Sequence, residues 1–76
     1  MKISARNVFK GRVVDVKKGA TTAHVKIDVS GTIVTSSITN EAVDELKLSV
    51  GKSAYAVIKA SDVMIGIDTG AGRGKR

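Results

Sequence analysis

The sequence predicts a small, mainly β domain with one short helix. Its 76 residues include many β-branched side chains and no Pro, a composition that favours sheets. Residues 22–29 alternate strictly between apolar and polar side chains, which is the pattern of a strand with one buried face. Shorter patterns of the same kind flank this segment, and only one stretch has helical spacing. We therefore expect a single sheet-based fold.

The segment 22–29 is the clearest strand of the chain. One face carries only apolar side chains, at Ala23, Val25, Ile27 and Val29. His24 lies on the other, polar face and is expected to be a surface residue. Ser30 and Gly31 then predict a tight turn, and residues 32–39 form the return strand of a hairpin.

A long strand is predicted before this hairpin, at residues 7–16. Gly11 interrupts its pattern and indicates either a bulge or a close approach of two backbones. After the hairpin, Thr39 and Asn40 can cap a helix of about two turns. Val43 and Leu46 lie three residues apart in that helix and are expected to face inward together.

Two further strands are predicted after the helix. Residues 53–59 are apolar on both faces, which indicates burial on both sides. A bend at 60–62 follows, and the alternation resumes with three apolar side chains, Val63, Ile65 and Ile67. Three strands, a helix and two strands are the order of a five-stranded barrel of the OB type with one short helix.

Residues 1–67 are expected to form one domain, followed by a flexible, basic, Gly-rich tail at 68–76. A domain of this size buries only about 60% of the surface of its unfolded chain, and the absence of Cys removes disulfides as a source of stability. Spare sheet edges and a strand with two apolar faces predict pairing between subunits, with a strand exchanged between them.

The composition excludes several function classes. The absence of Cys and the single His, His24, argue against thiolate or two-His metal sites within one chain and leave no base for a nucleophilic triad. No apolar run approaches the roughly 18 residues of a membrane span, and no signal peptide is recognisable, so a cytoplasmic location is expected. The net charge of +6 indicates an anionic partner, although charge can also serve solubility alone.

Two short segments concentrate groups that can bind an anion. Ser4-Ala5-Arg6-Asn7 brings a hydroxyl, a guanidinium and an amide together before the first strand. Lys59-Ala60-Ser61-Asp62 offers an ammonium, a hydroxyl and backbone N–H groups where a strand bends. Such donors suit a tetrahedral oxyanion. From residue chemistry alone, the alternative is a solvated strand start and an ordinary turn.

The same segments resemble the two signature motifs of the molbindins, the small Mop-type molybdate-binding proteins. The opening from Met1 to Asn7 is similar to the first signature, and Val57 to Met64 is similar to the second. The resemblance covers residues 1 to about 67. It implies an OB-like fold and a hexamer built as a trimer of dimers. It also implies oxyanion sites at subunit interfaces, where the first motif of one chain meets the second motif of another.

The resemblance also implies the site residues. The interface site would be formed by Ser4, Ala5, Arg6, Asn7, Lys59, Ala60 and Ser61. Ala60 stands where family members carry a hydroxyl residue, so it can donate only its backbone N–H. A second oxyanion site near a threefold axis would involve the turn of Gly19, Ala20, Thr21 and Thr22. The ligand would be molybdate or tungstate, with no protein atom bound to the metal and no catalytic cofactor.

The resulting hypothesis is a cytoplasmic protein that stores or buffers molybdate or tungstate and has no catalytic activity. One alternative is an OB-fold nucleic-acid-binding module, which would stack bases on exposed aromatic side chains. Only Phe9 and Tyr55 are available for this, and Tyr55 is expected to be buried, so nucleic acid is the weaker hypothesis. Another alternative is a molybdate-sensing regulatory domain of a larger protein.

Overall fold

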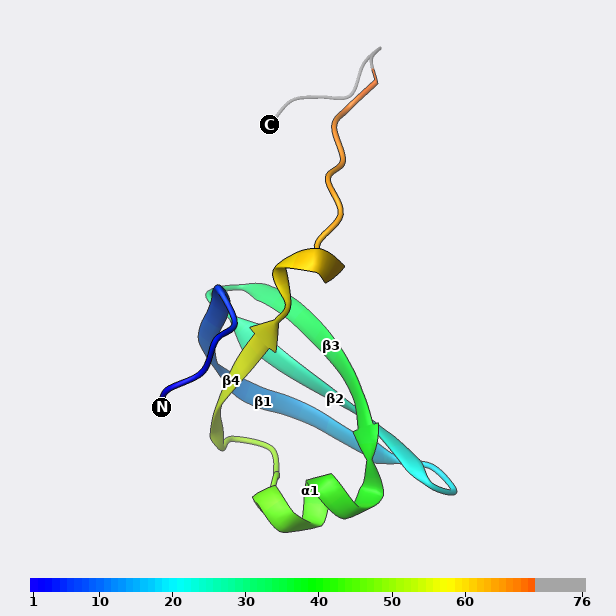
Figure 1. Ribbon diagram of the computed structural model, residues 1–76. Helices are drawn as coiled ribbons and strands as arrows, with labels where there is room; N and C mark the ends of the chain where they lie inside the picture. Colours follow the sequence, from blue (N-terminus) through cyan, green and yellow to red (C-terminus); the bar gives the residue numbers. More distant parts are fainter. Residues whose placement is uncertain (70–76) are drawn as a thin grey trace.

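A computed structural model describes residues 1–69 of the chain (Figure 1). The tail predicted for residues 68–76 lies outside the described residues from position 70 onward. The elements follow one another as β1 (Asn7–Lys18), β2 (Thr22–Val29), β3 (Thr32–Thr39), α1 (Asn40–Leu46), β4 (Ser53–Ile58) and a single 3-10 turn, η1 (Ala60–Asp62). The predicted order of three strands, a helix and a further strand is therefore confirmed.

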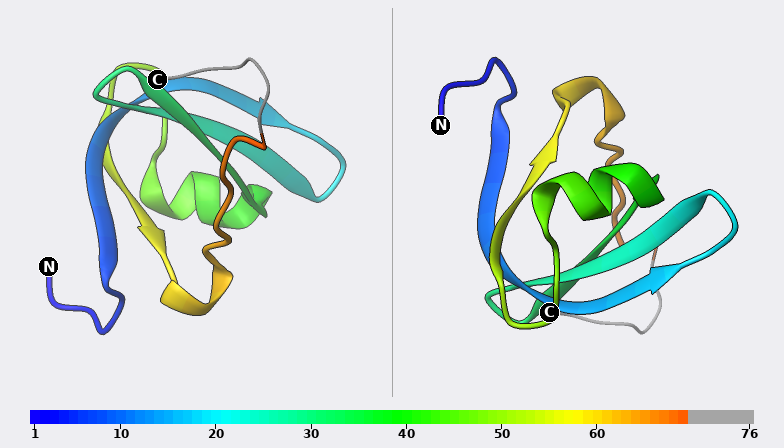
Figure 2. Two further views of the ribbon diagram at one scale, coloured as in Figure 1. Left: turned by 90° about the horizontal axis from the view of Figure 1, so that it is seen from above. Right: turned by 90° about the horizontal axis from the view of Figure 1, so that it is seen from below.

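The four strands form one antiparallel sheet in the order β3-β2-β1-β4. The sheet is strongly curved, and α1 lies across its concave side (Figure 2). Within the described residues β3 and β4 are the edge strands and do not pair with each other, so the barrel stays open.

β1 holds the sheet together because it pairs with two neighbours in succession. Its first half, from Asn7 to Arg12, pairs with β4, and its second half pairs with β2. The β1–β2 register shifts at Val14, which has no partner between the pairs of Val13 and Asp15. Such a bulge bends a strand and increases its twist, which allows β1 to leave β4 and continue along β2.

Of the two features predicted at Gly11, a bulge or a close approach of two backbones, the structure shows the close approach. The bulge of β1 lies three residues later, at Val14. A Cβ atom at Gly11 would lie 2.5 Å from the Asp28 carbonyl oxygen and 2.6 Å from Cγ2 of Ile27. Only glycine fits where β1 crosses β2 at this distance.

The core lies between the concave face of the sheet and α1. It consists of six buried apolar residues, Val13, Ala23, Val25, Ile27, Val43 and Ala56. The predicted inward face of β2 supplies three of them, whereas His24 is exposed as expected. Strict alternation thus placed β2 correctly, because successive side chains of a strand point to opposite faces.

The prediction that Val43 and Leu46 face inward together is wrong for Leu46, which is 58% exposed. The helix ends at Leu46, and Lys47 adopts a left-handed conformation with φ of 53°. The N–H of Leu48 then donates to the carbonyl of Val43 at 3.0 Å. This reversal carries the chain back to the core, so Leu48 packs there in place of Leu46.

The predicted fifth strand at residues 63–67 does not form within the single chain described. The segment has no ladder partner among the described residues and leads away from the sheet (Figure 1). Its apolar side chains face solvent, with Met64 91%, Ile65 88% and Ile67 84% exposed. Alternation describes a segment that is suited to a sheet, but a strand forms only where another strand supplies hydrogen-bond partners.

The expectation that β4 is buried on both faces holds for only one face. Ala56 is buried, whereas Tyr55 and Val57 remain 47% and 40% exposed. The reason is that no described part of the chain covers the outer face of β4. Both edge strands and this face therefore remain open to contact with another molecule.

Candidate functional site

The two motifs meet in one pocket because of the β1–β4 ladder. Asn7, the first residue of β1, pairs with Ile58, the last residue of β4. Residues just before β1 and just after β4 therefore lie side by side. Together they form a pocket of about 470 Å³, lined by Ile3, Ser4, Ala5, Arg6, Val57, Lys59, Ala60 and Ser61.

All charged side chains that line the pocket are positive. Arg6 and Lys59 are its two charged residues, and no acidic residue lines it. The one ion pair within residues 1–69 joins Lys18 to Asp44, so neither pocket cation is neutralised by a carboxylate of the described chain. Ser4 and Ser61 add hydroxyl groups. Two cations and two hydroxyls facing one space are suited to an anion that carries more than one charge.

The bend after β4 supplies further donors. Lys59 precedes η1 in an extended conformation, and its carbonyl accepts the N–H of Asp62 at 2.9 Å. The carbonyl of Ala60 accepts the N–H of Val63 at 3.2 Å. The N–H groups of Ala60 and Ser61 donate no hydrogen bond to any described residue. Ala60, which lacks a hydroxyl, can thus still contribute its backbone N–H to an anion.

Six of the seven residues predicted for this site line the pocket, and Asn7 does not. The Asn7 side chain instead donates from Nδ2 to the Ile58 carbonyl at 3.3 Å. Ile3 and Val57 line the pocket but were missing from the predicted set. Apolar residues within a motif have the same pattern as core residues, so only the position of the outer face of β4 could have identified Val57.

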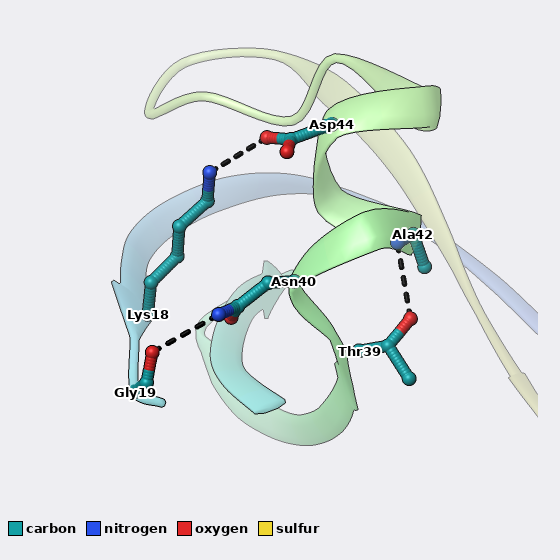
Figure 3. A network of polar contacts seen from close by, with 6 residues as sticks. All are labelled: Lys18, Gly19, Thr39, Asn40, Ala42 and Asp44. Carbon is teal, nitrogen blue, oxygen red and sulfur yellow. Dashed lines mark hydrogen bonds and ion pairs between the residues drawn. The ribbon is translucent and has the colours of Figure 1, made fainter. Parts of the chain in front are cut away.

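The turn predicted as a second site lies at the other end of the sheet, beside α1 (Figures 1 and 3). Gly19 N–H donates to the Thr22 carbonyl at 2.7 Å. Asn40 makes two hydrogen bonds to the turn. Its backbone N–H donates to the Thr21 carbonyl at 2.9 Å. Its Nδ2 donates to the Gly19 carbonyl at 3.0 Å (Figure 3). These bonds occupy three carbonyls of the turn and leave the N–H of Ala20 without a partner in the described chain.

This second location has less charge than the pocket. Lys18, at the end of β1, is bound to Asp44 of α1 at 2.6 Å (Figure 3). The residues Gly19, Ala20, Thr21 and Thr22 are all exposed. One chain therefore offers backbone N–H and hydroxyl groups at this turn, and its nearest cation in sequence is already paired.

Two features are absent from the part of the chain that the structure describes. Residues 1–69 contain no group of three His, Asp or Glu side chains that could hold a metal ion. None of their helices has the length and apolar character needed to cross a membrane.

The fold and the pocket define a small OB-like domain with a basic site at the end of its β1–β4 ladder. The chain belongs to the TOBE domain family, whose model matches residues 3–65. It is 51% identical over 69 residues to a probable molybdenum-pterin-binding protein of Haemophilus influenzae, which covers 90% of this chain and 100% of that protein.

Solved structures agree with the family and with the fold. MopII from Clostridium pasteurianum matches with a TM-score of 0.82 and 45% identity, covering 87% of this chain and 100% of that chain. The cytoplasmic molybdate-binding protein ModG, with molybdate bound, matches with a TM-score of 0.85 and 46% identity. That match covers 90% of this chain and 49% of the ModG chain. The predicted OB-like fold and the resemblance to Mop-type proteins are thereby confirmed.

Proposed function

We propose that this protein binds molybdate, and tungstate of the same shape and charge, in the pocket between Arg6 and Lys59. The observation that carries the proposal is the meeting of two unpaired cations in a pocket without an acidic residue. The similarity to proteins described as molybdenum-pterin-binding and molybdate-binding supports the identity of the anion.

A dianion loses its bound water when it enters the pocket, so protein groups have to replace that water for binding to occur. A buried, unpaired dianion would be very unfavourable. Arg6 and Lys59 offset its two charges, while Ser4, Ser61 and the N–H groups of η1 donate to its oxygens. Contacts of this kind involve the oxygens only, so no protein atom has to leave the metal when the anion dissociates. The protein is in this proposal a reversible binding protein and not an enzyme.

A second copy of the chain would complete the pocket. The resemblance implies that the motifs of different chains meet, whereas here the β1–β4 ladder brings both motifs of one chain together. We place the partner over this pocket and over the exposed side chains of Tyr55 and Val57. The expected assembly is the hexamer of the molbindins, a trimer of dimers.

Strand exchange would account for the open barrel. An apolar groove of about 400 Å³ runs beside β4, lined among others by Val25, Ile27, Ile38, Leu48 and Tyr55. The segment 63–67 carries exposed apolar side chains and has no ladder partner among the described residues. Its insertion into the groove of a second copy would bury both surfaces and supply the missing fifth strand.

The turn at Gly19 to Thr22 is proposed as a second, weaker oxyanion site. It has backbone donors, but the adjacent cation, Lys18, is paired with Asp44, so several copies would have to surround one anion. With both kinds of site, the assembly would store molybdate in the cytoplasm and buffer its concentration.

The rival nucleic-acid function has one observation in its favour, the exposure of Phe9 and Tyr55 at 41% and 47%. The pairing register of β1 and β4 argues against a nucleic-acid-binding function. Phe9 pairs with Ala56, and the next residue, Lys10, pairs with Tyr55. Paired residues share a face and successive residues do not, so the two rings project from opposite faces and form no common stacking platform.

Calorimetric titration tests the proposal. Molybdate and tungstate should bind tightly at defined stoichiometry, with much weaker binding of sulfate and phosphate. Lys59→Ala should weaken molybdate binding roughly tenfold or more, because a charge-assisted bond is lost. Lys26→Ala is the matched control, since it removes the same charge from the exposed face of β2 outside the pocket. Equal losses in both variants, or no heat with molybdate, would refute a specific site.

A further inference from the structure

Asn7 occupies the point where the two halves of the pocket are joined. It begins β1 and pairs with Ile58, the last residue of β4. Its part-buried side chain donates from Nδ2 to the Ile58 carbonyl at 3.3 Å. The bond links positions 51 residues apart, of which one directly follows Arg6 and the other directly precedes Lys59 in the sequence.

The ladder at this point has to hold two like charges together. Arg6 and Lys59 are the residues next to the terminal Asn7–Ile58 pair, and both line the same pocket. Like charges held close together repel one another. Strand ends also open readily, because they have few neighbours. In the empty protein the repulsion between the two cations therefore favours separation of the start of β1 from the end of β4.

We propose that Asn7 is a positioning residue of the oxyanion site, which holds the ends of β1 and β4 together before the anion arrives. This inference rests on the proposed function. Asn7 does not line the pocket, and its amide donates one hydrogen bond to the Ile58 carbonyl, so we assign it an indirect role through Arg6 and Lys59. Its contribution is preorganisation: the two cations are already in place, and the anion does not have to draw the strand ends together.

Replacement of the side chain measures this contribution. Asn7→Ala should weaken molybdate binding about fivefold, which corresponds to about 1 kcal/mol, the typical net value of one hydrogen bond. Thr39→Ala is the matched control. It also removes one hydrogen bond from a side chain, the 3.1 Å bond from Ala42 N–H, but at α1 and away from the pocket. It should lower stability without changing affinity at the pocket.

A double-mutant cycle separates positioning from a merely structural role. If Asn7 acts by holding the two cations together, its removal should matter much less once Lys59 is already alanine. In the Lys59→Ala background, Asn7→Ala should therefore leave the Kd for molybdate nearly unchanged, instead of raising it about fivefold. The same fivefold loss in both backgrounds would show that Asn7 acts independently of the cation pair and would overturn the inference.

Amide hydrogen exchange tests the empty protein. Without molybdate, Asn7→Ala should speed exchange at Ile58 and Phe9, near the end of the β1–β4 ladder, and saturating molybdate should restore protection. Unchanged exchange in the empty variant would overturn the inference. Failure of the unsubstituted protein to bind molybdate would refute the proposed function and this role together, whereas normal binding with unchanged affinity of Asn7→Ala would refute the role of Asn7 alone.

Discussion

The substitution Gly11→Ala perturbs the closest contact between two strands. The added Cβ would lie 2.5 Å from the Asp28 carbonyl oxygen, 2.6 Å from Ile27 Cγ2 and 3.0 Å from Val29 Cγ2. The first of these atoms belongs to the backbone of β2, which is paired on both sides, with β1 and with β3. It cannot retreat without disturbing hydrogen bonds of a central strand.

The expected change in the free energy of unfolding for Gly11→Ala is the sum of two opposing contributions. Forcing an extra methyl group into a packed site destabilises by about 1–3 kcal/mol. Replacing glycine by alanine also restricts the unfolded chain and stabilises by about 0.4–1 kcal/mol where the backbone allows it. The backbone at Gly11 is not left-handed, so this gain is available and offsets part of the clash. We expect a net loss of about 1–2 kcal/mol, or about 4–16 °C in melting temperature for a chain of this size.

Thermal unfolding followed by circular dichroism, at one fixed protein concentration, measures this loss. The concentration is fixed because assembly makes a melting temperature depend on it. Ser37→Ala is the control, since it introduces alanine at an exposed position of β3 and should change stability by no more than about 0.5 kcal/mol. An unchanged melting temperature for Gly11→Ala would show that β1 and β2 do not approach one another as described.

Four further outcomes are expected. Molybdate at about 100 times its Kd should stabilise the folded protein by about 2.7 kcal/mol, visible as a raised melting temperature; an unchanged melt would contradict binding to the native state. Thr39→Ala should cost about 1 kcal/mol in urea unfolding, because it removes the N-cap of α1. Arg6→Ala should weaken molybdate binding roughly tenfold or more by calorimetry, and an unaltered Kd would remove Arg6 from the site. Ile65→Asp should shift the protein to smaller species in analytical ultracentrifugation, whereas an unchanged assembly would refute exchange of the segment 63–67.

The polar residues that line the pocket could be predicted from the sequence, but its complete lining could not. Cations and hydroxyls in two short motifs indicated an anion, and six of the seven predicted residues do line one pocket. Asn7 could not be distinguished from a ligand contact, because an amide donor has the same chemistry whether it binds an anion or a carbonyl. Only the tertiary contact with Ile58 shows where its nitrogen is used.

The sequence by itself determined which segments are suited to strands and which face of β2 is buried, because both follow from alternation along a single strand. It also determined the start of α1, where Thr39 accepts the N–H of Ala42. The tertiary structure alone decided where the bulge lies, and that Leu46 and the outer face of β4 are exposed. It also decided that residues 63–67 stay unpaired within one chain. The physical reason is that pairing and burial are properties of two segments, and a pattern within one segment does not specify what lies opposite it.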